Sequence, residues 1–163
     1  MAESFNPQGL VKVLWVTSIS NPAAPTAAEV AAGVDLTEAI MSDGVAGFSR
    51  DPQYVDATPL GATAERTVTG LASTTNGALT MLRGNTAGSD NADLLDALID
   101  DIGTAGYVVF ALDGTLTATH LVDVFPSTLA SVNPQPMQGG QAARYVVGFS
   151  HTGEFQINVA IAS

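Results

Sequence analysis

The sequence is dominated by short runs of β-branched and aromatic residues that are separated by turn residues. The run 154–161 is the clearest, because large apolar residues occupy every second position, at Phe155, Ile157, Val159 and Ile161. This period of two is typical of a strand with one buried face. Similar runs cover 10–16, 34–40, 65–72, 78–83, 107–112, 115–124 and 143–149. Together they predict a mainly β (α+β) fold, either a β-sandwich or a partial barrel, with a packed helix.

Two helices are expected among these strands. Thr26 and Glu29 have the spacing of a capping box, so a short helix should begin after Thr26 and end at Gly33. A longer helix should begin at Ser89 or Asp90 and end at Gly103. Its apolar stripe comprises Leu94, Leu95, Leu98, Ile99 and Ile102, and its solvated side carries Asp93, Asp96, Asp100 and Asp101. Trp15, in the first run, is the expected anchor of the core.

Three segments interrupt the regular pattern. Residues 42–63 have no periodicity and contain several glycines and prolines, so they are expected to form a long inter-strand loop. Loops of about 20 residues are uncommon in compact domains and are usually functional. The Asn76-Gly77 step predicts a tight hairpin between the runs 65–72 and 78–83. Residues 126–141 are expected to be irregular.

Size and charge limit the classes of function. The chain has 163 residues and no obvious linker, so residues 1–163 are expected to form one domain. It carries 16 acidic and 5 basic residues, a formal charge of −11, which argues against gripping nucleic acid through a basic surface. The absence of cysteine excludes disulfides and thiolate chemistry. Neither a signal peptide nor a membrane-spanning run is expected.

Few residues could support catalysis or metal binding. The two histidines, His120 in a predicted strand and His151 in a predicted turn, have no neighbours at metal-ligand spacing, and we interpret both as packing or turn residues. A Ser-His-Asp triad assembles in three dimensions, but the nucleophile elbow Gly-x-Ser-x-Gly is absent. The acids Asp90, Asp93, Asp96, Asp100 and Asp101 lack the EF-hand pattern. We therefore expect no catalytic, cofactor or metal site, and a protein that is not an enzyme.

Three stretches resemble a known family. The first is Val13-Leu14-Trp15-Val16 followed by residues 19–37, ISNPAAPTAAEVAAGVDLT. The second is the helix-then-strand segment 94–109. The third is Phe125-Pro126, then a Pro-Gln-Pro loop, then the sequences GFS and TGE within 148–154. Their combination resembles the major tail tube proteins of long-tailed (siphovirus-type) bacteriophages, in particular those of actinobacteriophages.

This resemblance implies a β-sandwich flanked by a helix, in a subunit that forms probable hexameric rings. The rings would stack into a tail tube, a conduit through which DNA passes during ejection without specific binding. Implied partners are further copies of the chain, the tape measure protein and the tail terminator, in a virion tail assembled in the host cytoplasm. An N-terminal arm (1–8) and the loop 42–63 would bridge rings, and the expected inter-ring contacts are Phe5, Arg50, Asp51, Tyr54 and Asp56.

The charged residues fit a conduit. Each basic residue that neutralises a phosphate adds favourable DNA binding, so a lumen poor in lysine and arginine lets DNA pass. Expected lumen-facing acids are Glu38, Glu65 and Asp123, all placed on predicted strands. Arg66, Arg83 and Arg144 are expected, like Arg50, to pair with acids across subunit boundaries; ordinary surface positions are the alternative for these arginines.

Two other classes of protein remain open. One is another phage particle component, such as a capsid-decorating or head-tail joining protein. The other is a soluble β-sandwich that binds a carbohydrate or a peptide. The aromatic content of 6%, with one tryptophan, offers little material for such a binding surface.

Overall fold

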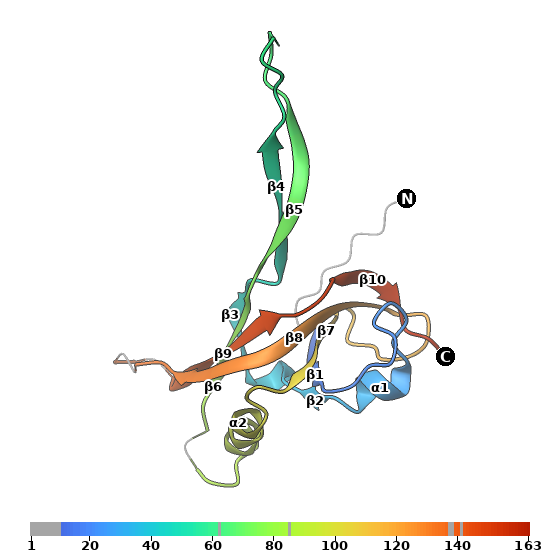
Figure 1. The fold of residues 1–163 in the computed structure, drawn as a ribbon. Helices are drawn as coiled ribbons and strands as arrows, with labels where there is room; N and C mark the ends of the chain where they lie inside the picture. The colour runs from blue at the N-terminus through green and yellow to red at the C-terminus, as the bar shows by residue number, and fades with distance from the viewer. Residues whose placement is uncertain (1–10, 62, 85, 137–138, 141) are drawn as a thin grey trace.

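The fold is a β-rich body from which a long hairpin extends (Figure 1). The computed structural model describes residues 11–61, 63–84, 86–136, 139–140 and 142–163. The elements in chain order are β1 (Lys12–Val16), α1 (Ala27–Ala31), β2 (Val34–Asp35), the 3-10 helix η1 (Thr37–Ala39), β3 (Ile40–Ala46), β4 (Ser49–Asp56), β5 (Thr67–Thr75), β6 (Gly77–Leu82), α2 (Asp90–Asp100), β7 (Ala105–Ala111), β8 (Leu121–Pro134), β9 (Arg144–His151) and β10 (Gln156–Ala160). This confirms the predicted mainly β fold with one main helix.

The body contains an eight-stranded antiparallel sheet in the order β2-β1-β7-β8-β9-β6-β3, with β10 also paired to β8. β8 is 14 residues long. Its beginning pairs with β10, with Leu121 opposite Ala160, and its remainder pairs with β9, from Ser127 opposite His151 to Pro134 opposite Tyr145. One long strand therefore organises most of the body.

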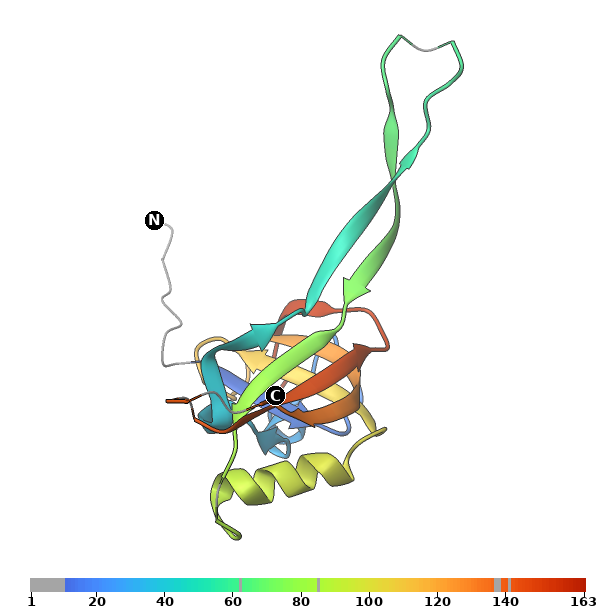
Figure 2. The same cartoon turned by 90° about the vertical axis from the view of Figure 1, so that its left-hand side faces the viewer.

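Both faces of the sheet are covered. Val13 and Trp15 of β1 pack into one apolar cluster, whereas Leu14 and Val16 pack into another, as the alternation of a strand requires. α2 covers the first cluster through Leu98, which is buried, and α1 covers the second. Figure 2 shows α2 lying across the end of the body opposite the hairpin.

Trp15 anchors the core, as predicted, and is completely buried. Its Nε1 donates a hydrogen bond to Asp101 Oδ2 at 3.2 Å. The expectation that Asp101 is solvated is therefore wrong, because this carboxylate satisfies the only polar atom of the buried indole side chain. The predicted apolar stripe of α2 is also too wide, since Ile99 and Ile102 are 47% and 45% exposed.

The segment 42–63 is not an irregular loop. β3 continues to Ala46 and β4 occupies Ser49–Asp56, so that most of the segment is strand. All eight residues of β4 are exposed. Alternation of apolar and polar residues indicates a strand with one buried face. Because both faces of β4 are exposed, its sequence does not show this alternation.

The prediction of a tight hairpin at Asn76-Gly77 is also wrong. β5 ends at Thr75 and β6 begins at Gly77, but β5 pairs with β4, whereas β6 pairs with β3 and β9. Asn76 therefore joins two strands that run on in succession. The reversal of the chain lies in the connection 57–66 between β4 and β5.

Three further boundaries differ from the sequence prediction. The run 34–40 forms the two-residue β2 and then η1. Residues 112–120 form a loop, so His120 precedes β8 and does not lie within a strand. β8 passes through Pro126 into the segment expected to be irregular. Along this edge of β8, pairing with β10 ends at Val124 and pairing with β9 begins at Ser127. Pro126 lies in the gap between these two pairings.

The final strand departs from strict alternation. Asn158 has a φ of +58°, and the register with β8 shifts between Gln156 and Val159. Ile157 is consequently 62% exposed, whereas Ile161 is buried. A local bulge thus removes one of the four residues expected on the buried face.

Candidate assembly surface

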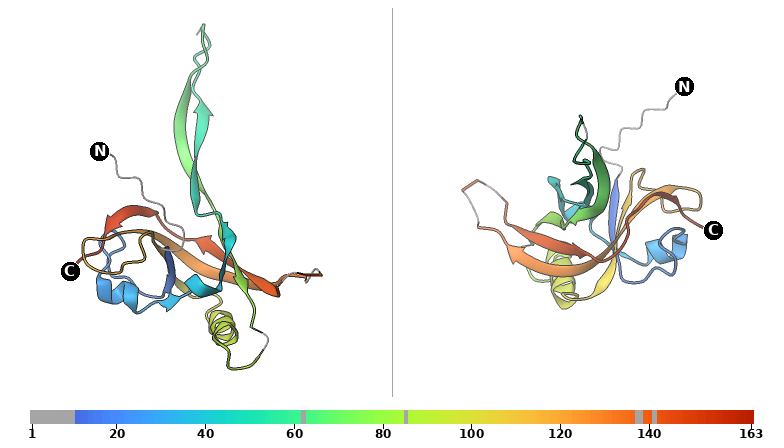
Figure 3. Two further views of the ribbon diagram at one scale, coloured as in Figure 1. Left: turned by 180° about the vertical axis from the view of Figure 1, so that it is seen from behind. Right: turned by 45° about the horizontal axis from the view of Figure 1, so that its top comes forward.

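The most distinctive surface is the hairpin arm, which comprises β4, β5 and the connection 57–66. Its two strands form a separate antiparallel sheet, from Ser49 opposite Thr75 to Asp56 opposite Thr67. The arm projects away from the body, and the views from behind and from above show the same separation (Figure 3). Both outer edges of this two-stranded sheet are free of pairing among the described residues.

The arm exposes large apolar side chains to solvent. Their exposed fractions range from 52% to 109%, for Tyr54, Val55, Leu60, Val68 and Leu71. A two-stranded hairpin without a packed face is marginally stable in water at best. Exposed edges and apolar residues on such a hairpin mark a surface that another chain covers.

The strand register assigns these residues to two faces. Val55 lies opposite Val68, and an added Cβ on Gly70 would lie 2.8 Å from a methyl group of Val55, so these three residues share one face. Tyr54 lies opposite Thr69 on the other face. The register shifts between Pro52 and Tyr54, where β5 holds one extra residue. Neither face of the arm is wholly polar.

At its base the arm contacts the connection between β9 and β10 through an ion pair. Arg50 Nη1 lies 3.5 Å from Glu154 Oε1, with side chains that are 50% and 73% exposed. A shallow cleft beside this pair is lined by Ala72, Thr74 and Phe155 in addition. An ion pair so exposed contributes at most about 1 kcal/mol to stability, so it holds the arm weakly.

The connection 57–66 is closed by hydrogen bonds around Thr58. The N–H of Arg66 donates to Thr58 Oγ1 at 2.8 Å, and the N–H of Ala57 donates to the Arg66 carbonyl at 2.8 Å. Asp56 Oδ1 accepts from the N–H of Thr58 at 2.9 Å. Hydrogen bonds from the Thr58 side chain and backbone lower the pKa of the Asp56 carboxyl below its ordinary value. These hydrogen bonds close the connection next to the ends of β4 and β5.

The predicted inter-ring residues lie together on one element. Arg50, Asp51, Tyr54 and Asp56 are all on β4, where Arg50, Tyr54 and Asp56 alternate along one face and Asp51 belongs to the other. Phe5 and the N-terminal arm 1–8 lie outside the described residues. Their role in inter-ring contacts stays a prediction. Sequence reasoning missed Val55, Val68 and Leu71 as contact residues, although Val68 and Leu71 lie in the predicted run 65–72.

The predicted lumen acids do not gather in one place. Glu38 lies on η1, Glu65 in the connection 57–66 and Asp123 on β8. Only Asp123 is on a strand, so the strand assignment of the other two was wrong. Asp123 Oδ1 accepts a hydrogen bond of 2.7 Å from the N–H of Asn158, which ties β8 to β10.

The remaining arginines occupy two regions. Arg66 belongs to the arm. Arg83 and Arg144 lie side by side at the far end of the β6–β9 pair, where the N–H of Arg83 donates to the Ala143 carbonyl at 2.9 Å. Arg144 Nη1 lies 3.9 Å from the sulfur of Met41. Whether these side chains pair with acids of other subunits stays a prediction.

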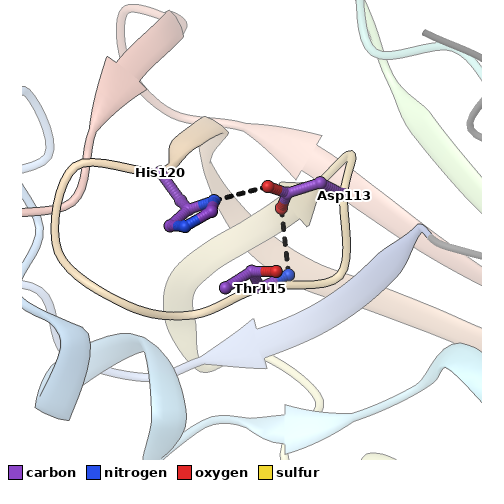
Figure 4. A network of polar contacts seen from close by, with 3 residues as sticks. All are labelled: Asp113, Thr115 and His120. Atoms are coloured by element: carbon purple, nitrogen blue, oxygen red, sulfur yellow. Dashed lines mark hydrogen bonds and ion pairs between the residues drawn. The ribbon is translucent and has the colours of Figure 1, made fainter.

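His120 closes the loop 112–120 and does not sit in a strand. Its Nδ1 lies 2.5 Å from Asp113 Oδ2, and Asp113 Oδ1 accepts from the N–H of Thr115 at 2.9 Å (Figure 4). The hydrogen bond from Thr115, followed by that from His120, lowers the pKa of the Asp113 carboxyl. All three partners belong to one loop, so the contact stabilises that loop locally.

His151 and Ser127 form a pair that superficially resembles a nucleophile and its base. Ser127 Oγ lies 2.9 Å from His151 Nδ1 and also donates to the Phe125 carbonyl at 3.1 Å. Ser127 is completely buried, so no substrate carbonyl reaches its oxygen. Burial lowers the pKa of His151, whose ring lies between those of Phe155 and Phe48. The pair is part of the packed interior, consistent with a packing residue.

Within the ranges that the structure describes, no three metal-ligating side chains come together. No helix of that part of the chain is long and apolar enough to cross a membrane.

Sequence comparison decides the family. A sequence profile of the family described as phage tail tube protein matches residues 1–163. The chain belongs to the phage tail tube protein family. No curated protein sequence matches it. Membership covers the full length and agrees with a structural protein of the virion tail.

Solved structures show the same fold at low sequence identity. A chain of the anti-feeding prophage baseplate, from a six-fold symmetrised cryo-EM structure, is 13% identical with a TM-score of 0.60, over 98% of this chain and 97% of that one. A chain of the tail of an empty gene transfer agent particle, refined with helical C6 symmetry, is 11% identical with a TM-score of 0.52, over 96% of this chain and 100% of that one. The tail tube fold of this family member therefore extends over nearly the whole chain.

Proposed function

We propose that this protein forms hexameric rings that stack head to tail into the phage tail tube, through which DNA leaves the capsid. The observation that carries the proposal is the hairpin arm, which leaves the body with both faces and both edges exposed. The six-fold symmetry stated for the two structurally similar particles supports six subunits per ring.

The energetics favour an arm that is covered in the assembly. Complete burial of a valine or leucine side chain stabilises by about 1.5–3 kcal/mol. Val55, Val68 and Leu71 are each at least half exposed. Their burial against a neighbouring subunit would supply several kcal/mol per contact. A contact between unlike surfaces does not close on itself along an axis, so its natural product is an open stack.

The charge of the subunit suits a conduit for DNA. With a formal charge of −11 the chain offers few groups that would bind phosphates. We also propose that Glu38, Glu65 and Asp123 face the lumen and that residues 1–163 form one domain. The proposed partners are a tape measure protein and a tail terminator, and the proposed place of assembly is the host cytoplasm. The sequence resemblance in residues 13–37 supports a siphovirus-type phage of actinobacteria as the source.

The test is a variant without the arm. Because β4 and β5 pair with each other, the deletion must remove both strands; removal of 50–62 alone would leave β5 without its partner. Phe48 can be joined directly to Asn76, since an added Cβ on Gly47 would lie only 2.1 Å from the Asn76 carbonyl oxygen. The variant lacking 49–75 should fold as a monomer, with the circular dichroism of a β-rich body, and should form no filaments in negative-stain electron microscopy.

The wild-type chain under the same conditions should form long hollow filaments of uniform width. Filaments of the shortened variant that equal those of the wild type would remove the arm from the stacking contact. Persistent wild-type monomers or trimers at high concentration would contradict the tube and favour a capsid-decorating or head-tail joining protein, or a binding module.

A further inference from the structure

We propose that Phe48 positions the hairpin arm, because its ring is a plug that fixes the direction in which the arm leaves the body. Only the effect of Phe48 on assembly depends on the proposed function. The direction of the arm in the free subunit can be measured independently. Phe48 lies between the end of β3 at Ala46 and the start of β4 at Ser49.

The backbone turns sharply at this point. Gly47 has a φ of +75° and Phe48 a φ of +56°, the left-handed region that a bulky side chain seldom occupies. Glycine is required at position 47, because an added Cβ would lie 2.1 Å from the Asn76 carbonyl oxygen. A phenylalanine held in this conformation must gain compensating contacts. The contacts of its ring supply them.

The Phe48 ring sits in a socket of aromatic side chains from the body. The ring centroids of Phe110 and Phe125 each lie 5.2 Å from that of Phe48, at interplanar angles of 75° and 67°. His151 lies at 5.3 Å and 61°, and Phe149 at 6.2 Å. These edge-on arrangements are the favourable ones for aromatic pairs. Strands β7, β8 and β9 therefore all hold the ring.

The second strand of the arm is held through the same ring. An added Cβ on Gly77, at the start of β6, would lie 2.4 Å from Phe48 Cζ. The ring thus fills the space that a side chain at position 77 would take. Since Gly77 follows Asn76 and the end of β5, the plug fixes both strands at the base of the arm. An ion pair at the same base, between Arg50 and Glu154, is exposed and monodentate at 3.5 Å.

Removal of the plug should free the arm without dismantling the body. Phe48 is only half-buried and packs at the edge of the first apolar cluster, whose centre contains Trp15 and Leu129, both completely buried. Truncation of Phe48 leaves those residues in contact. The expected result is a folded body carrying an arm of variable direction.

The experiment measures the distance between arm and body in the monomer by double electron–electron resonance. The chain has no cysteine, so spin labels attach only at Thr69→Cys on β5 and Asp96→Cys on α2, both exposed positions. A low protein concentration keeps the labelled subunits monomeric. In the otherwise wild-type chain the distance distribution should be narrow. With Phe48→Ala it should become at least about two-fold broader, because the displacements of mobile segments exceed those of ordered ones by roughly that factor.

Two further variants separate positioning from general loss of packing. Gly77→Ala leaves Phe48 unchanged but displaces its ring, and it should broaden the distribution as well. Val132→Ala removes apolar contacts from the same cluster, because Val132 on β8 is half-buried and packs against it. This matched control should leave the distribution narrow.

A distribution that stays narrow in both Phe48→Ala and Gly77→Ala would overturn the inference, as would equal broadening in Val132→Ala. Circular dichroism checks that each variant is folded, and Phe48→Leu replaces Phe48→Ala if the latter unfolds. Absence of filaments from a wild-type chain whose arm is rigid would refute the proposed function and leave the positioning role standing. A positioning role also predicts that Phe48→Ala raises the concentration needed for filament growth.

Discussion

His151 shows how a single residue links packing to pH. Its ring is partly buried among phenylalanine rings and bonded to Ser127, and burial lowers its pKa below the ordinary value of 6.5. The unfolded chain therefore binds this proton at a higher pH than the folded chain does. Stability from the neutral ring is complete above the unfolded pKa and is lost as the pH falls below it.

This sign gives a prediction for pH-dependent unfolding. The free energy of unfolding of the wild-type chain, from urea titrations between pH 7.5 and roughly 5.5, should fall with falling pH around and below the reference value of 6.5. His151→Phe keeps an aromatic ring in the cluster and removes the titrating group, so its slope should be flatter. An unchanged slope in His151→Phe would contradict the assignment.

At the scale of elements, the hairpin arm is the part whose structure differs most from the sequence prediction. β4 and β5 have the residues of exposed strands, with apolar side chains on both faces, and this composition gives no advantage in the isolated subunit. In the proposed function this composition serves contacts with another copy of the chain. Substitutions on the arm should therefore affect assembly and leave the stability of the monomer almost unchanged.

A pair of matched variants tests this separation. Leu71→Ser on the arm and Leu112→Ser on the body replace leucines that are 88% and 43% exposed. Leu71→Ser should change the free energy of unfolding by no more than about 0.5 kcal/mol, as is usual for surface positions. Leu112→Ser should lower it by about 1 kcal/mol or more, because more than half of that side chain is buried. Leu71→Ser should raise the critical concentration for filament growth about ten-fold or more, because the lost burial is worth about 1.5–3 kcal/mol.

Sedimentation at several concentrations gives the critical concentration of each variant. Leu112→Ser should match the wild-type chain. Equal critical concentrations for Leu71→Ser and the wild type would exclude Leu71 from the contact.

Elements with local signals were predicted from the sequence, and elements without them were not. The capping box of α1 is present, with Thr26 Oγ1 accepting from the N–H of Glu29 and Glu29 accepting from the N–H of Thr26. Hydrogen bonds from Ser20, followed by those from Thr26, lower the pKa of Glu29 to about 2. The stop after α2 was equally local, because the helix ends at Asp100 and is soon followed by Gly103, with a φ of +88°.

The path of the hairpin depends on distant partners instead. The Asn76-Gly77 step has the local chemistry of a turn, but β6 is held by β9, whose Tyr145 lies opposite Met81 although the two are 64 positions apart in the sequence. Such pairing overrides a two-residue preference. For the candidate site, the glycines and prolines of the segment 42–63 marked the region that contains β4. Its strand structure and the Phe48 socket were not visible, because the aromatic rings come from three separate strands.

At the scale of the whole molecule, the subunit combines a body with two covered sheet faces and an arm with none. The arm and α2 lie at opposite ends of the molecule, so its two ends along the direction of the arm are different (Figures 1 and 2). A subunit with two different ends and a protruding contact suits head-to-tail repetition. Its charge of −11 makes copies repel one another, and the apolar residues of the arm are the groups available to overcome that repulsion.

The most direct test is a cryo-EM helical reconstruction of filaments grown from the purified wild-type chain. The account predicts a hollow tube in which β4 and β5 of each subunit pack against a subunit of the adjoining ring, with Tyr54 and Leu71 buried at that contact. A reconstruction in which these strands project into solvent, while the rings touch through other elements, would contradict it.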